Sequence, residues 1–174
     1  MSIAALLLRL GPVALAAILF LPGCSGSSSS GNWQEFKSQK CRFSAQFPGD
    51  VEVEEVGADS QFQAVSDDAI FRVTCSRVPP LPEKAAMREF RVMCDGAAKS
   101  LDAIVEETRN TKVQGQPAIE FTLSFNLAGA DTVSHTRYIR CQGRLYQQIV
   151  TTTAGTSRDQ DIQKFFRSFQ LETE

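Results

Sequence analysis

Apolar and polar residues alternate along several segments of this chain, and a period of two is typical of β-strands with one buried face. The clearest run is 119–127, where apolar side chains occupy the five odd-numbered positions. It predicts a long strand that turns at 128–131 and is followed by strands over 132–141 and 144–153, joined by a tight hairpin at Gln142-Gly143. Three consecutive antiparallel strands of this kind form a meander.

The earlier part of the chain shows the same period in shorter runs. They predict strands over 42–47, 51–54, 61–65 and 70–78, with turns at 48–50 and 66–68. The first two strands are each expected to keep one face in water. Trp33 and Phe36, which precede them, are expected to pack on the domain, because large aromatic side chains usually contribute to a core.

Two segments change to the helical period. After a proline-rich stretch at 79–82, residues 83–101 place apolar side chains three and four positions apart, which predicts a helix with one apolar stripe. Ser157 and Gln160 fit a capping box at the start of a second helix. The apolar residues of that second helix are Ile162, Phe165, Phe166 and Phe169. The pattern therefore predicts an α+β domain, in which two main helices flank an antiparallel β-sheet of about six to seven strands.

The beginning of the chain has a different character. Arg9 is the only charged residue before Glu35, and an apolar stretch follows it. That stretch is shorter than the roughly 20 residues that span a bilayer, and it ends at small residues. A short apolar core behind one positive charge predicts a cleavable signal peptide over residues 1–23.

Leu21-Pro22-Gly23-Cys24 resembles the lipobox of bacterial lipoproteins, which implies that Cys24 carries acyl chains such as palmitate. Residues 24–31 then form the lipidated cysteine and a flexible Ser/Gly linker, and residues 32–174 a single domain. The resemblance implies a bacterial cell envelope protein bound to the membrane by its lipid. Ser25 resembles the sorting signal for an outer membrane facing the periplasm, if the cell has two membranes. The alternatives are an ordinary signal peptide with an incidental cysteine, or an uncleaved membrane anchor.

Composition excludes one class of partner. The formal net charge is −2, and the chain has no run of basic residues. It therefore lacks the electrostatic footprint of a nucleic-acid-binding protein, and no polybasic patch is present to bind anionic lipids. Membrane attachment is expected to depend on the acyl chains alone.

Four further cysteines follow Cys24: Cys41, Cys75, Cys94 and Cys141. An even number of cysteines in an exported domain predicts disulfides, and three pairings are possible. The sequence does not choose among these pairings. The alternative is that some of the four are small buried apolar side chains.

Several short motifs recur in the order of one known fold. They are Phe43–Pro48, the proline-led helix, Gly115–Phe121, Arg137-Tyr138, Gly143–Tyr146 and Phe165–Phe169. Together they resemble the Mog/PsbP-like fold, which is shared by photosystem II PsbP subunits, a Ran-binding nuclear import factor and many bacterial lipoproteins. The resemblance implies a sheet sandwiched by helices and a role in docking to larger assemblies.

Catalytic and metal chemistry has few candidate residues. His135 is the only histidine, and we expect it to be an ordinary sheet residue on the same strand face as Arg137. The acidic residues of the first strands could offer oxygen ligands to a hard cation, but their spacing is that of a solvated edge. These residues are Asp50, Glu52, Glu54, Glu55 and Asp59. We expect no enzyme activity, no metal and no cofactor.

The leading hypothesis is an exported, membrane-anchored lipoprotein whose non-catalytic PsbP-like domain docks to an envelope protein or assembly. The alternative is a carrier of a small ligand, held in a pocket between the sheet and the helices.

Overall fold

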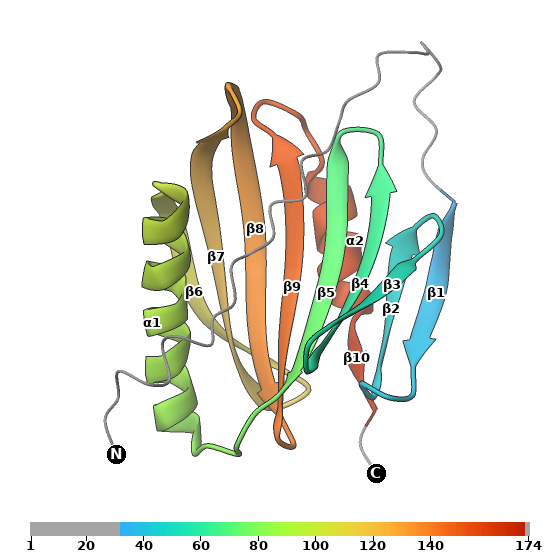
Figure 1. The fold of residues 1–174 in the computed structure, drawn as a ribbon, viewed down its shortest axis with the longest axis vertical. Helices are drawn as coiled ribbons and strands as arrows, with labels where there is room; N and C mark the ends of the chain where they lie inside the picture. The colour runs from blue at the N-terminus through green and yellow to red at the C-terminus, as the bar shows by residue number, and fades with distance from the viewer. Residues whose placement is uncertain (1–31, 173–174) are drawn as a thin grey trace.

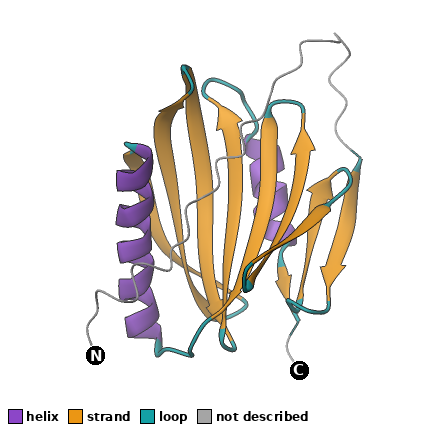
Figure 2. Cartoon of the chain, in the orientation of Figure 1, coloured by secondary structure: helices purple, strands orange, loops and turns teal. Residues whose placement is uncertain are grey.

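The computed structural model describes residues 32–172, so the predictions for the signal peptide, Cys24 and the linker lie outside the described residues. The described chain forms a seven-stranded sheet, a three-stranded sheet and two α-helices, α1 (Glu83–Leu101) and α2 (Asp159–Ser168) (Figures 1 and 2). The strands are β1 (Trp33–Ser38), β2 (Phe43–Pro48), β3 (Glu52–Val56), β4 (Asp59–Ser66), β5 (Ala69–Arg77), β6 (Ile104–Val113), β7 (Gln116–Leu127), β8 (Ala130–Cys141), β9 (Arg144–Thr153) and β10 (Gln170–Leu171). The predicted α+β class is confirmed.

The large sheet is antiparallel and has the order β3-β4-β5-β9-β8-β7-β6. The predicted meander is confirmed in β7, β8 and β9, and it is extended by β6, where the sequence placed Glu106 and Glu107 on a strand or its entry but predicted no bounds. β6 is an edge strand, and its first seven residues are all exposed. A strand without a buried face needs no apolar alternation, so the period of two is absent there.

The small sheet has the order β1-β2-β10, with β2 in the middle. The expectation that β2 and β3 each keep one wet face is wrong. β2 is buried on both faces except at Gln46, because strands flank it on either side and α2 contacts it. β3 is exposed along its whole length, because it is an edge strand of the other sheet.

The two helices cover opposite faces of the large sheet. Ala86, Phe90 and Cys94 of α1 pack on the face of β7 that carries Phe121 and Leu123. The α1 boundaries are those that the sequence predicts. The opposite face is covered by α2 together with the small sheet (Figure 1).

Aromatic rings fill the layer between α2, the small sheet and the large sheet. Phe165 of α2 is fully buried, with ring centroids 5.2 Å from Phe47 and 5.5 Å from Phe71. Trp33 meets Phe71 at 5.6 Å, and Phe36 packs on the same core, so the predicted packing of both residues is confirmed.

The predicted capping box of α2 is wrong. The helix begins at Asp159, after Arg158, and no side chain caps it. Arg158 instead forms ion pairs with Asp67 and Asp68 in the β4–β5 turn, at 2.9 and 2.8 Å. Because Arg158 is bound to this turn, the helix starts after Ser157. Asp159, in the first turn of the helix, complements the positive end of the helix dipole.

A largely buried arginine connects α2 to the sheet. Arg137 on β8 donates to Glu120 on β7 at 2.7 Å and to the carbonyl oxygen of Phe166 on α2 at 2.7 Å. Its guanidinium also lies 4.6 Å from the centre of the Phe166 ring. The Arg137 side chain is only 12% exposed, so these contacts are shielded from water.

Candidate functional site: a hollow at one end of the sheet

Three connections meet at one end of the large sheet, because antiparallel strands return to the same end at every second turn. These connections are the proline-rich segment between β5 and α1, the β6–β7 turn and the β8–β9 turn (Figure 1). They surround a hollow of about 280 Å³. The residues that line this end hollow are Pro80, Leu81, Glu83, Gly115, Gln116, Pro117, Arg140, Cys141, Gln142, Gly143 and Arg144.

The β8–β9 turn is fixed against the end of β5. The carbonyl oxygen of Gly143 accepts a hydrogen bond of 2.9 Å from the backbone N–H of Val78. Gly143 has a φ of +71°, and a Cβ at this position would lie 3.4 Å from the carbonyl oxygen of Val78. Both the left-handed backbone and the close approach favour glycine here.

The proline-rich segment is held in place by a buried arginine. Arg140 on β8 donates to the carbonyl oxygen of Pro79, and its Nε lies 2.8 Å from Glu89 on α1. The Arg140 side chain is 7% exposed, so its contacts with Pro79 and Glu89 are shielded from water and fix the proline-rich segment to β8. It leaves the neighbouring Leu81 side chain 41% exposed at the rim of the hollow.

Two arginines face each other beside the hollow. Arg77 and Arg144 are directly opposite in the β5–β9 ladder, an arrangement in which like charges destabilise a sheet. Within residues 32–172, neither has a carboxylate partner at ion-pair distance, and Arg144 donates a long hydrogen bond of 3.4 Å to the Lys40 carbonyl oxygen. The nearby Lys112, by contrast, is paired with Glu83 at 3.1 Å. The two guanidinium groups can therefore donate hydrogen bonds to carboxylates from outside the domain.

Sequence reasoning missed this arginine pair. Each arginine ends or begins a predicted strand and looks like an ordinary surface residue. Only the register of β5 against β9 brings the two together. The exposed Leu81 could have been noticed, because it is an apolar residue within a run of prolines.

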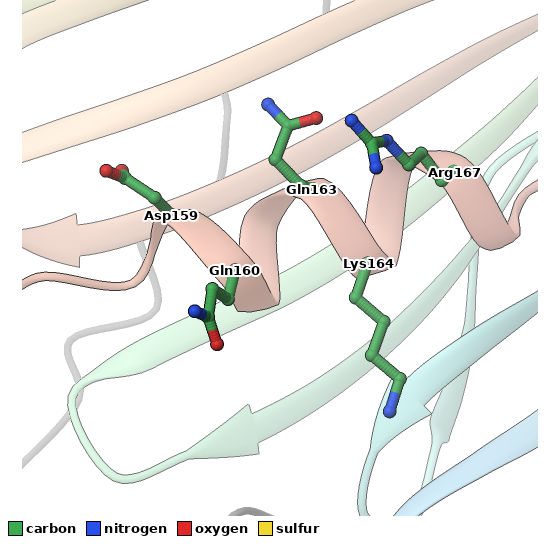
Figure 3. A pocket seen from close by; sticks show the side chains of 5 residues that line it. All are labelled: Asp159, Gln160, Gln163, Lys164 and Arg167. Carbon is green, nitrogen blue, oxygen red and sulfur yellow. The ribbon is translucent and has the colours of Figure 1, made fainter.

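A second hollow, of about 380 Å³, lies along α2 and is shown in Figure 3. Its lining residues are Asp159, Gln160, Gln163, Lys164 and Arg167, all of them from this one helix. Gln163 and Arg167 point to one side of α2 and Lys164 to another, where its ammonium lies 4.6 Å from the centre of the Trp33 ring. No second element closes around this surface, so it offers little enclosure to a ligand.

Neither hollow lies between the sheet and a helix, where the carrier hypothesis places its pocket. In the described domain that space is filled by aromatic rings and by the α1 contacts. Neither of these two hollows therefore supplies the pocket of the carrier hypothesis.

The four cysteines of the domain are free buried thiols in this structure. Cys41, Cys75 and Cys141 belong to the core on the α2 side of the sheet, and Cys94 belongs to the core beneath α1. The Cys41 and Cys75 thiols share a hydrogen bond. This bond, helped by Ser60 and Ser38, outweighs the effect of burial and lowers the pKa of Cys41 to about 6, while the same bond and burial raise the pKa of Cys75.

His135 lies on the same face as Arg137, as predicted, and its Nδ1 is 3.3 Å from the Thr122 hydroxyl. Burial lowers the pKa of His135, although the negative charges of Asp159 and Glu107 oppose the shift. Thr122 is its cross-strand neighbour in the β7–β8 ladder, and a partly buried sheet histidine bonded to a neighbouring hydroxyl is typical of a structural role.

The acidic residues of the first strands are dispersed. Glu55 binds Lys40 at 2.6 Å and the Ser60 hydroxyl, while Asp50 accepts from Gln34. No group of three or more His, Cys, Asp or Glu side chains within residues 32–172 could hold a metal ion. Among the same residues, neither helix is long and apolar enough to cross a bilayer.

Comparisons with known proteins identify the fold. No protein-family model matches the chain, and no curated protein matches its sequence. The Ran-binding protein Mog1p from Saccharomyces cerevisiae matches in structure with a TM-score of 0.54 and 10% identity, over 82% of this chain and 96% of that chain. Cyanobacterial PsbP (CyanoP) from Synechocystis matches with a TM-score of 0.52 and 16% identity, over 87% and 98%. The fold is Mog/PsbP-like.

A third structure, from Bacteroides thetaiotaomicron, has a TM-score of 0.57 and 16% identity over 80% of this chain. The present chain spans only 48% of that protein. Identities this low establish the fold and leave the function to be argued from the site.

Proposed function

We propose that this chain is an exported lipoprotein, anchored through Cys24, and that its Mog/PsbP-like domain docks without catalysis to another protein of the envelope. The anchor rests on the sequence of residues 1–31. The docking role rests on one observation: the end hollow combines an exposed apolar rim with two arginines that have no carboxylate partner in the domain.

The chemistry of the hollow indicates the kind of partner. Leu81, Pro80 and Pro117 offer apolar surface, and Arg144 adjoins it. Arginine forms paired hydrogen bonds with carboxylates and is common in protein interfaces. An acidic segment that also carries an apolar side chain would neutralise the repulsion between Arg77 and Arg144 while it covers Leu81.

The position of the hollow fits an anchored protein. β1 begins at the end of the large sheet opposite the hollow (Figure 1). A lipid attached ahead of β1 would therefore tether the domain by the far end, and the hollow would remain accessible to a partner. Mog1p, which has the same fold, is a Ran-binding protein, and this supports a binding role for the present domain.

Site-specific photocrosslinking in the producing cells tests the docking proposal. A photoreactive residue at Gln142, on the rim of the hollow, should give a defined crosslinked product, and the same residue at Val65, at the other end of the sheet, should not. Reversing both charges, with Arg77→Glu and Arg144→Glu, should abolish the product. The matched control Lys164→Glu, on α2, should retain it. Equal products from both positions, or a product that survives charge reversal, would refute docking at the hollow.

The anchor is tested separately by mass spectrometry of the protein from membranes. The expected N-terminal residue is an acylated Cys24. An intact Met1, or an unmodified thiol at position 24, would rule out the anchor whatever the crosslinking result.

A further inference from the structure

The structure assigns Cys41 and Cys75 as the disulfide partners of this domain, and we propose that the exported protein carries this single bond. The proposal selects one pair from the four cysteines and leaves Cys94 and Cys141 as buried thiols. It rests on the proposed export only for the source of oxidant. The pairing itself follows from the fold.

Cys94 is excluded because the sheet separates it from the other three. It lies on α1 and packs with Phe121 and Leu123 on one face of the sheet. Cys41, Cys75 and Cys141 all belong to the core on the opposite face. A disulfide requires Cα atoms within about 7 Å, which a path through a packed sheet does not allow.

A bond between Cys75 and Cys141 is excluded by strand spacing. Cys75 is on β5 and Cys141 on β8, and β9 lies between these strands. Neighbouring strands are about 4.8 Å apart, so two intervals place the Cα atoms roughly 10 Å apart or more. Their side chains cannot be bridged without displacing β9.

Cys41 lies next to Cys75 on independent evidence from the backbone and the side chains. In the sheet, Cys75 is directly opposite Ser60 on β4 and Tyr146 on β9. The Tyr146 hydroxyl donates to the Cys41 carbonyl oxygen at 2.7 Å, and the nearby Ser60 hydroxyl helps to lower the pKa of the Cys41 thiol. Tyr146 and Ser60, the lateral neighbours of Cys75, thus both lie beside Cys41, and the Cys41 and Cys75 thiols are close enough for each to shift the pKa of the other.

The chemistry is a two-electron thiol–disulfide exchange. The Cys41 and Cys75 S–H bonds break and one S–S bond forms. The two electrons and two protons pass to a disulfide-containing oxidant, such as a thiol oxidoreductase, which leaves as a dithiol. Cys41 and Cys75 are 3% and 5% exposed in the folded domain, so the exchange takes place while the chain folds, before the β1–β2 turn closes over β5.

Peptide mapping of the full chain tests the pairing directly. Reduced, denatured protein is refolded with a mixture of reduced and oxidised glutathione, free thiols are blocked, and the product is digested with trypsin without reduction. Trypsin cleaves after Lys40, Arg42, Arg72 and Arg77. The expected product is the dipeptide 41–42 joined to the pentapeptide 73–77, with Cys94 and Cys141 blocked. Linkage of Cys41 or Cys75 to any other cysteine, or blocked thiols at all four of Cys41, Cys75, Cys94 and Cys141, would overturn the proposal.

Stability provides a second measurement. The bond closes a loop of more than 30 residues, so reducing the wild-type protein should lower its melting temperature by about 10 °C. The Cys94→Ser control should keep this response to reductant, whereas Cys75→Ser should lose it. A response that Cys94→Ser abolishes would contradict the pairing.

The same map, made on protein whose thiols are blocked in living cells, separates this inference from the proposed export. A linked pair in both samples supports both proposals. If the refolded protein is linked and the four cysteines of the domain are all free thiols in the cellular protein, the pairing stands and the exported address is refuted. If the refolded protein is unlinked, the pairing is refuted.

Discussion

Arg137→Met removes a charge that connects α2 to the large sheet while keeping most of the apolar stem. Two arginines bind the same carboxylate, Glu120, but in different surroundings. The Arg137 side chain is 12% exposed and also binds Phe166, whereas the Arg109 side chain is 64% exposed. Comparing substitutions of Arg137 and Arg109 therefore separates the effect of burial from the effect of charge.

The expected cost of Arg137→Met is about 3 kcal/mol. Breaking a buried ion pair typically costs about 3–5 kcal/mol, and because Glu120 retains Arg109 the lower end applies. The cost includes the Phe166 carbonyl oxygen, which loses a donor in a partly buried site. Arg109→Met should cost about 0.5 kcal/mol, because exposed ion pairs contribute little.

Urea unfolding of the purified full chain, followed by fluorescence, measures both costs. Trp33 is the only tryptophan, and it lies between Phe71 on the sheet and Lys164 on α2, so its emission reports on this layer. Equal costs for the two substitutions, or a larger cost for Arg109→Met, would refute the argument from burial.

The cost of Arg137→Met should also depend on pH. Burial alone would raise the pKa of Glu120, but the hydrogen bonds and charges of Arg109 and Arg137 outweigh it and lower the pKa. A lowered pKa in the folded state stabilises the protein above the unfolded value of about 4.3, and this stabilisation is lost as the pH falls through the folded value. The difference between wild type and Arg137→Met should therefore shrink in acid. A difference that stays constant down to pH 3 would contradict this coupling.

Three further outcomes are expected. Phe165→Ala should destabilise the domain by about 3–5 kcal/mol in urea unfolding, since this ring is fully buried, whereas Val92→Ala, at a 60% exposed position on α1, should change stability by less than about 0.5 kcal/mol. Burial lowers the pKa of His135, so the stability that the neutral imidazole contributes is present above the unfolded pKa of about 6.5 and decreases as the pH falls. His135→Gln should therefore flatten the decline in melting temperature between pH 7.5 and 5.5. An unchanged slope would exclude this role. Gly143→Ala should cost about 1–2 kcal/mol, because its backbone is left-handed and close to β5, and a neutral effect in thermal unfolding would show that the turn relaxes freely.

The sequence by itself determined the elements in which burial repeats with a fixed period. The α1 boundaries, the alternation in β7 and the burial of Phe165 follow from this rule, because a side chain's face is set by its position along a regular helix or strand. The motifs of the Mog/PsbP-like fold lie in these regular elements or in the turns next to them, which is why the fold could be predicted.

Tertiary structure decided the features that depend on which elements become neighbours. β6 has no apolar period because it is an edge strand, and β2 loses its wet face because β1, β10 and α2 surround it. Arg158, by binding the β4–β5 turn, moves the start of α2 away from the capping residue that the local sequence favours.

The same reason explains what could be foreseen of the functional residues. The sequence supplied the four cysteines of the domain, but only the strand order places Cys41 against Cys75 and puts the sheet between them and Cys94. Likewise, Arg77 and Arg144 become a like-charged pair only through the register of β5 against β9. Local sequence fixes the direction of a side chain along its own element, whereas contacts between elements depend on the packing of the whole domain.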